Sequence, residues 1–170
     1  MKHNWPLAMV GAAALLFTGV RTWADDQTDA ADVASVLPGA TVSLERGLEA
    51  SRREGTPISA RYEIEDGVLQ LSIYTMSSDQ FTEVIIDPRS GDIKQARAIT
   101  AGQKLKAAAA EGAAMSWSTM SLEAVVGNAL RAIPGYRAIG VVAEFETGHP
   151  IATTTLVRGQ TVREVIETLD

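Results

Sequence analysis

Apolar and polar side chains alternate along residues 58–65, so that every second position is apolar. Because successive side chains of a β-strand point to opposite faces, this period of two predicts a strand with one buried face and one wet face. Asp66 and Gly67 form a typical hairpin dipeptide, and the alternation resumes beyond them at residues 69–73. The apolar positions of the two predicted strands are Ile58, Ala60, Tyr62, Ile64, Leu69, Leu71 and Ile73.

Two further turns extend this hairpin into a small sheet. Turn-forming residues at 77–79 precede an apolar stretch at residues 81–87, and a Pro-Arg-Ser-Gly turn at residues 88–91 leads into residues 92–97. The pattern therefore predicts three or four antiparallel strands in the first half of the chain.

A helical period precedes these strands. Ser43 is a good helix N-cap, Glu45 places a negative charge in the first turn, and Gly55 is a natural stop. The face at helical spacing consists of Leu44, Gly47, Leu48 and Ser51. Its small residues indicate either a close approach to a sheet or a helix of marginal stability.

The second half predicts the same order of elements. Ser121 is the N-cap of a helix whose apolar stripe spans residues 122–133, and Pro134-Gly135 ends it. Strands are predicted within residues 136–146 and 151–157, and residues 161–169 are compatible with a strand or a helix.

An internal repeat relates the two halves. Residues 119–123 (TMSLE) resemble residues 41–45 (TVSLE), 78 positions earlier, and the Glu-x-Glu-x-Gly pattern of residues 63–67 recurs 81 positions later. The second offset aligns Glu83-Val84-Ile85 with Glu164-Val165-Ile166, which favours a strand for the last segment. The chain then ends before any counterpart of residues 92–97.

These patterns predict an α+β fold made of two repeats, each with one helix followed by a sheet of three or four antiparallel strands. The repeats comprise residues 41–98 and 119–170. Between them, the alanine-rich residues 99–118 predict a helical connector that is broken or bent near Gly112. Trp117, near its end, is expected to be a packing residue.

The N-terminus has the pattern of an export signal. A basic start is followed by an apolar run, and Thr22-Trp23-Ala24 places small residues at a cleavage site. We expect residues 1–24 to be a cleaved signal peptide and the mature protein to be periplasmic; a retained membrane anchor is the alternative. Residues 25–40 are expected to form a flexible or partly helical leader.

Composition restricts the classes of partner. The chain has 15 basic and 21 acidic residues, and cleavage after Ala24 leaves 13 basic residues. This acidic balance argues against nucleic acid and anionic membranes as partners. The chain has no cysteine, which excludes disulfides, cysteine nucleophiles and lipid attachment at the cleavage site.

Few residues offer catalytic or metal-binding chemistry. His149 is the one histidine of the predicted mature chain, so multi-histidine metal sites and His-paired serine triads are excluded there. Two carboxylate pairs, Glu63 with Glu65 and Glu144 with Glu146, each lie on one strand face. They are compatible with cation binding, with acid–base chemistry, or with a merely solvated face. A loose group of basic residues lies within residues 89–106, and we expect it to form a solvated face. Its members are Arg89, Lys94, Arg97, Lys104 and Lys106.

The motifs of the first half resemble a PepSY domain. They are Val42-Ser43-Leu44-Glu45 at a helix start, Glu63-Ile64-Glu65-Asp66-Gly67, and a strand over residues 81–87 that closes on Pro88-Arg89-Ser90-Gly91-Asp92-Ile93. The resemblance covers residues 41–98 and, more loosely, residues 119–170, which lack the Asp-x-x-Ser-Gly-Asp ending. It implies a non-catalytic domain that restrains peptidases, in an exported protein with two such domains.

Three functions are therefore considered. The first is a non-catalytic protein-binding module, whose partner is another extracytoplasmic protein such as a peptidase. The alternative is a periplasmic protein that binds a small ligand or a divalent cation through the paired glutamates. The third is a hydrolase that uses carboxylates alone, which requires a pocket holding two acids with separated pKa values. No catalytic, cofactor-binding or metal-binding residue is assigned.

Overall fold

The computed structural model describes residues 23–78 and 80–170. The predicted signal peptide lies outside the described residues, apart from Trp23 and Ala24. None of the helices in the described part of the chain is long and apolar enough to span a membrane.

Four α-helices and seven strands make up the described chain. The first half contains α1 (Trp23–Val36), α2 (Leu44–Ser51), β1 (Thr56–Glu65), β2 (Val68–Ser77), β3 (Gln80–Ile86) and β4 (Ile93–Ala98). The second half contains α3 (Gly102–Met115), α4 (Leu122–Ala132), β5 (Arg137–Glu146), β6 (His149–Arg158) and β7 (Thr161–Thr168). Short 3-10 helices at Leu37–Gly39 and Arg52–Glu54 follow α1 and α2.

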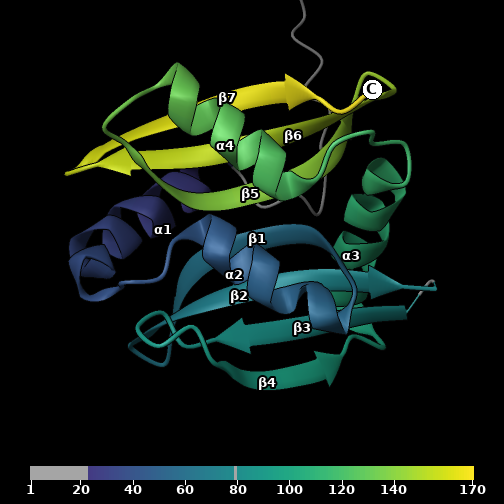
Figure 1. Cartoon of the computed structure of the whole chain (residues 1–170), viewed down its shortest axis with the longest axis horizontal. Helices are drawn as coiled ribbons and strands as arrows, with labels where there is room; N and C mark the ends of the chain where they lie inside the picture. The colour runs from purple at the N-terminus through teal and green to yellow at the C-terminus, as the bar shows by residue number, and fades with distance from the viewer. Residues whose placement is uncertain (1–22, 79) are drawn as a thin grey trace, which may run out of the picture.

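All seven strands belong to one antiparallel sheet in the order β4-β3-β2-β1-β5-β6-β7, as Figure 1 shows. The prediction of two repeats, each with one helix followed by a sheet of three or four strands, is therefore wrong. The physical reason is that two separate sheets would leave β1 and β5 as edges with unpaired backbone groups. Pairing β1 with β5 satisfies these groups and buries both strands in the middle of one sheet.

The junction between the halves is short and centred on one residue pair. Ser59 pairs with Val142, Ala60 with Val141, and Arg61 with Gly140. Val141 follows Ala60 by 81 positions, which is the offset found in the sequence. Ala60 and Val141, which are equivalent by this offset, thus face one another across an antiparallel pair, and the two halves are arranged about an approximate two-fold axis at this point.

Helices cover both faces of the sheet. We call the face that carries Ile58, Ala60 and Tyr62 the front face, and the face that carries Ser59 and Arg61 the back face. Helices α2 and α4 contact each other over the front face (Figure 1). Helix α3 lies on the back face, mainly over β5 and β1, and α1 packs against β1, β6 and β7. The core therefore has apolar layers on both sides of the central strands.

The two repeat helices begin where the sequence predicts. The hydroxyl groups of Ser43 and Ser121 accept hydrogen bonds from the backbone N–H groups of Arg46 and Ala124, both at 3.3 Å. The buried residues of α2 are the predicted set of Leu44, Gly47, Leu48 and Ser51. A Cβ atom on Gly47 would lie 2.2 Å from Leu71 Cδ2, so the small residue does permit a close approach of α2 to the sheet.

The hairpin turns of the two halves also correspond. Asp66 and Gly67 have φ values of 51° and 77°, and Thr147 and Gly148 have 48° and 87°. Two successive positive φ angles are typical of the tight turns that match the twist of paired strands. The last segment forms β7, in agreement with the strand that the repeat predicts.

Two segments outside the repeats differ from expectation. The expected leader is largely helical in α1, and Ala30, Val33 and Leu37 are buried in the core. The connector helix α3 runs through Gly112 without a break. A Cβ atom at Gly112 would lie 2.9 Å from both Met76 Sδ and Phe81 Cε1, so this glycine brings α3 close to the back face instead of ending the helix.

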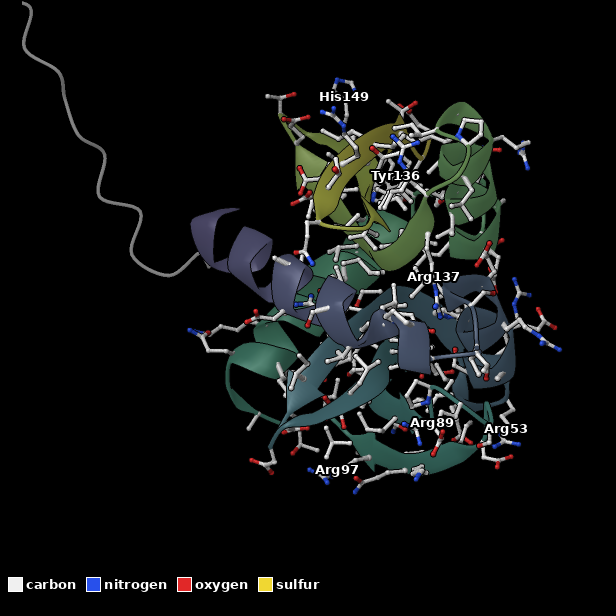
Figure 2. All side chains as sticks on the ribbon, turned by 90° about the vertical axis from the view of Figure 1, so that its left-hand side faces the viewer. Arg53, Arg89, Arg97, Tyr136, Arg137 and His149 are labelled. Carbon is white, nitrogen blue, oxygen red and sulfur yellow. The ribbon has the colours of Figure 1, made fainter. Side chains whose placement is uncertain are left out.

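The link between α1 and α2 is fixed where β1 and β5 diverge. Arg137 at the start of β5 donates hydrogen bonds to the carbonyl oxygens of Leu37 (3.1 Å) and Val42 (2.8 Å). Tyr62 of β1 donates its hydroxyl proton to the same Val42 oxygen, and the Arg137 guanidinium lies over the Tyr62 ring. Figure 2 shows Arg137 between α1 and the repeat helices. Both halves of the chain therefore hold the α1–α2 link.

Candidate functional site

The paired glutamates do not form a cation site in this structure. The Gln70 side-chain amide donates to Glu63 Oε1 (2.8 Å) and to Glu65 Oε2 (2.7 Å), so one neighbouring side chain bridges the first pair. In the second pair, Glu144 accepts a hydrogen bond from the Thr153 hydroxyl group at 3.1 Å. Within the described residues, no group of three or more potential ligands is placed to hold a metal ion.

His149 and Trp117 are both surface residues. His149 lies at one end of the molecule (Figure 2), with Nδ1 at 3.8 Å from an oxygen of the Asp170 side chain. Trp117 is 71% exposed, so the prediction that it packs in the interior is wrong. It occupies the turn directly after α3, where the chain leaves the sheet before α4 begins.

A buried polar layer lies between α3 and the back face. Glu111 of α3 is 5% exposed and accepts a hydrogen bond from the Ser59 hydroxyl group at 2.6 Å. Burial raises the pKa of the Glu111 carboxyl group, and the Ser59 hydrogen bond and the charge of Arg61 oppose this shift only in part. The sequence pattern alone did not predict the burial of Glu111. The one sequence feature that marks Glu111 is that it is the single acidic residue of the alanine-rich α3. In the structure its position faces the sheet.

A second buried acid lies beside this layer. Glu83 of β3 is 7% exposed and forms an ion pair with Lys104 of α3. The hydrogen bond with Glu83 and its negative charge raise the pKa of Lys104. Each buried acid therefore has a partner of its own, and the pairs fix α3 to the back face.

A cleft of about 210 Å³ lies where the two halves meet near the start of β1. Arg52 and Glu123 close one side of it through two hydrogen bonds of 2.7 and 3.1 Å. The hydrogen bond to Glu123 and the attraction of its charge raise the pKa of Arg52. Glu123 is the one acid among the described residues that line the cleft. The cleft therefore lacks the two acids that a carboxylate hydrolase requires.

The strand β4 is the most open element of the sheet. It pairs with β3 on one side, and β3 is its main contact within the described chain. Ile93 is half-buried, whereas the next five residues are exposed. Most other strands have at least one face covered by a helix, so we treat the outer side of β4, called the β4 edge, as the candidate site.

The hydrogen-bond ladder shows which backbone groups point outward at the β4 edge. The N–H group of Ile99 donates to the Phe81 carbonyl oxygen at 2.8 Å. In an antiparallel pair, alternate residues exchange both bonds with the partner strand. Arg97 and Gln95 thus face β3 like Ile99, while the N–H and C=O groups of Ala96 and Ala98 point away from the sheet. The side chains at these two positions are methyl groups, which leave the backbone accessible.

The turn before β4 sets its position. Oδ1 of Asp87 accepts hydrogen bonds from the N–H groups of Arg89 (2.8 Å) and Ser90 (3.1 Å), and Oδ2 lies 2.8 Å from Lys94 Nζ. The hydrogen bonds from Lys94 and from the two backbone groups lower the pKa of Asp87 to about 2. The Asp-x-x-Ser-Gly-Asp motif of the sequence is therefore a hydrogen-bonded turn that fixes the start of β4.

The β4 edge is basic although the chain is acidic. Residues 87–106 contain five basic residues and two acidic ones, whereas the whole chain has a net charge of −6. Arg89 and Arg97 lie at the same end of the molecule in Figure 2. From the sequence, this group of basic residues was expected to form a solvated face. The structure places two of these residues, Lys94 and Arg97, on β4, one in the turn before it, and two on α3.

The opposite edge of the sheet is better covered. Strand β7 pairs with β6 and also contacts α1. Val162, Val165 and Glu167 of β7 are half-buried. The two edges of the sheet therefore differ in both burial and charge.

Comparison with known proteins gives no match for this chain: no family model, no curated protein and no solved structure is similar to it.

Proposed function

We propose that this protein is an exported, non-catalytic binding module that takes up an extended segment of another extracytoplasmic protein at the β4 edge. The observation that carries the proposal is the pair of outward-facing backbone positions, Ala96 and Ala98, on a strand with both faces exposed. A partner strand that pairs there extends the sheet through main-chain hydrogen bonds.

The resemblance of residues 41–98 to a PepSY domain suggests the class of partner. Such domains are thought to restrain peptidases in their neighbourhood, and the N-terminal pattern of an export signal suggests a periplasmic location. We therefore propose an extracytoplasmic peptidase as the partner, with the β4 edge as the contact.

The docking site is tested with a matched pair of proline variants. Ala98→Pro removes an outward N–H group and leaves the bonds to β3 in place, because proline is tolerated on an edge strand where its nitrogen faces solvent. Ile166→Pro makes the same change on β7. There, Leu169 donates to the Pro150 carbonyl oxygen, so alternate residues place Ile166 outward.

The full-length protein, carrying a C-terminal tag and expressed in its own host, serves as bait for envelope proteins. We expect the wild type and Ile166→Pro to retain a protein that Ala98→Pro loses, with all three variants folded by circular dichroism. Capture of the same proteins by all three would contradict docking at the β4 edge.

The peptidase version has a separate test. Purified protein added to extracytoplasmic peptidases of the host is expected to lower the activity of at least one of them, and Ala98→Pro to leave that activity unchanged. If no peptidase across the panel is inhibited or forms a complex, the partner belongs to another class of protein.

A further inference from the structure

We propose that the segment taken up at the β4 edge is acidic, with carboxylate side chains on the back-face side and apolar side chains on the front-face side. This inference rests on the proposed function and specifies the chemistry of its partner. Three observations carry it: the basic residues near the edge, the face on which Arg97 lies, and the small residues on the other face.

The cations near the edge are only partly neutralised. Lys94 is paired with Asp87, and Lys104 is paired with Glu83. For Arg89, Arg97 and Lys106, no carboxylate of the described residues lies within 4.0 Å. All three residues are exposed. These charges are available to an acidic partner, and they would repel a basic one.

The strand register determines the face on which Arg97 lies. Arg97 lies opposite Glu83, whose side chain points to the back face and reaches Lys104 on α3. Directly opposite residues of an antiparallel pair share a face, so Arg97 also points to the back. Carboxylates on a partner strand would therefore approach Arg97 from the back-face side.

The front-face side of the edge accepts larger apolar groups. Ala96 lies opposite Val84 and Ala98 lies opposite Thr82, so both methyl groups are on the front face. Both alanines are exposed, because α2 contacts β1 and β2 further into the sheet. Side chains alternate between faces along a strand, so the complementary sequence alternates acidic and apolar residues.

A second copy of this chain fits the edge less well. An antiparallel pair of two β4 strands centred on Arg97 brings Arg97 against its own equivalent, which is unfavourable. The edge strand β7 is net acidic, but Val162, Val165 and Glu167 are half-buried and Glu167 accepts a hydrogen bond from Asn128, so β7 is less accessible than a free acidic segment. The same cations also protect the edge against aggregation, because they repel other copies while they attract an acidic segment.

The test uses two six-residue peptides, one with Glu and Val in alternation and one with Lys and Val. Each is titrated into the ¹⁵N-labelled full-length protein at low salt, and binding is followed by amide shifts. We expect the Glu peptide to bind about tenfold more tightly than the Lys peptide, since several exposed charge pairs change sign. The largest shifts are expected at Ala96 and Ala98, and high salt should weaken binding.

Variants locate the interaction. Arg97→Gln should weaken binding of the Glu peptide about two- to fivefold, as expected for one exposed ion pair. Ala98→Pro should abolish binding, and Ile166→Pro should leave it unchanged. Equal affinity for the two peptides, a lack of binding by both, or shifts confined to residues away from β4 would each overturn the proposal.

Two outcomes separate this inference from the proposed function. If Ala98→Pro loses the envelope partner but the acidic peptide is not preferred, the docking site stands and the acidic segment is wrong. If Ala98→Pro retains the partner, both fail. Light scattering checks for a second copy: an oligomer of the wild type that Ala98→Pro converts to a monomer would show that another copy of this chain occupies the edge.

Discussion

Asp87 and Glu111 are both carboxylates, and their surroundings shift their pKa values in opposite directions. Asp87 is stabilised in its charged form by Lys94 and by two backbone N–H groups. Glu111 is destabilised in its charged form by burial beneath α3. One residue therefore makes the fold more stable when ionised, and the other makes it less stable.

Asp87→Asn tests the turn before β4. The folded-state pKa of Asp87 is about 2, below the ordinary 3.8. The charged form therefore stabilises the fold above the ordinary pKa, and this contribution is lost as the pH falls towards 2. We expect the wild type to be more stable than Asp87→Asn at pH 6, and the difference to narrow between pH 4 and pH 2. Denaturant unfolding of both proteins across this range measures it; a difference independent of pH would contradict the stabilisation of the ionised Asp87 side chain by Lys94 and the two backbone N–H groups.

Glu111→Gln tests the buried acid. Because burial raises the folded-state pKa of Glu111, ionisation lowers the free energy of unfolding as the pH rises above the ordinary 4.5. An amide of the same shape avoids this cost and still accepts the Ser59 hydrogen bond. We expect the Tm to rise by about 2–4 °C at pH 7, the shift that 1 kcal/mol gives in a chain of this size.

The gain from Glu111→Gln should be smaller at pH 4, where the wild-type acid is largely protonated in both the folded and unfolded states. Thermal melts at the two pH values measure this. A variant that is less stable than the wild type at pH 7 would indicate that the fold requires the charged form of Glu111.

At the scale of elements, local sequence signals predicted most of the helices and strands. Serine caps fix the starts of α2 and α4, and dipeptides that adopt positive φ fix the two hairpin turns. The same signals predicted neither the burial of α1 nor the continuity of α3 through Gly112. Whether a glycine ends a helix or permits close packing depends on what lies beside it, and only the folded chain places Phe81 and Met76 there.

Gly47→Ala tests the close packing of α2 on the sheet. The new methyl group would lie 2.2 Å from Leu71 Cδ2, and Leu71 is fully buried. We expect a loss of about 1–3 kcal/mol in the free energy of unfolding, which is typical of overpacking in a core. Denaturant unfolding followed by circular dichroism measures it.

Gly127→Ala on α4 is the matched control. Its methyl group would meet only the flexible end of Arg131 at 3.4 Å, and alanine favours helix by about 0.5–1 kcal/mol over glycine. This variant should be neutral or stabilised. Equal effects of the two substitutions would show that helix propensity, and not the contact with Leu71, explains the result.

At the scale of the whole molecule, the two halves share one structure. They meet at the β1–β5 pair, α3 spans strands of both halves, and α2 packs against α4. Arg52 on one half is bonded to Glu123 on the other at 2.7 Å. Each half alone would expose the inner edge of its sheet and the apolar faces that these contacts bury.

A fragment that lacks residues 99–170 tests this dependence. We expect a fragment covering residues 25–98 to remain unfolded, because it loses the pairing of β1 with β5 and the helix that packs against α2. Thermal unfolding followed by circular dichroism should show a cooperative transition for the full chain and none for the fragment. A fragment that melts cooperatively would demonstrate an independent first half.

For the candidate site too, local sequence signals predicted some features and missed others. The basic residues near β4 and the Asp-x-x-Ser-Gly-Asp turn are visible in the sequence, and the turn is formed as a hydrogen-bonded unit. The sequence could not predict that β4 is an open edge with outward-facing alanines. This depends on whether another strand of the folded chain pairs with the outer side of β4.

By itself, the sequence determined the features that depend on near neighbours: helix caps, the alternation of strand faces, hairpin turns and the 81-residue offset that recurs in the pairing of Ala60 with Val141. The tertiary structure alone decided that both halves form one sheet, that Glu111 is buried and Trp117 exposed, and that β4 is left open. The physical reason is that backbone hydrogen bonds between distant strands do not depend on side-chain identity. Their partners are set by the joint burial of many residues, and this is resolved only when the whole chain has folded.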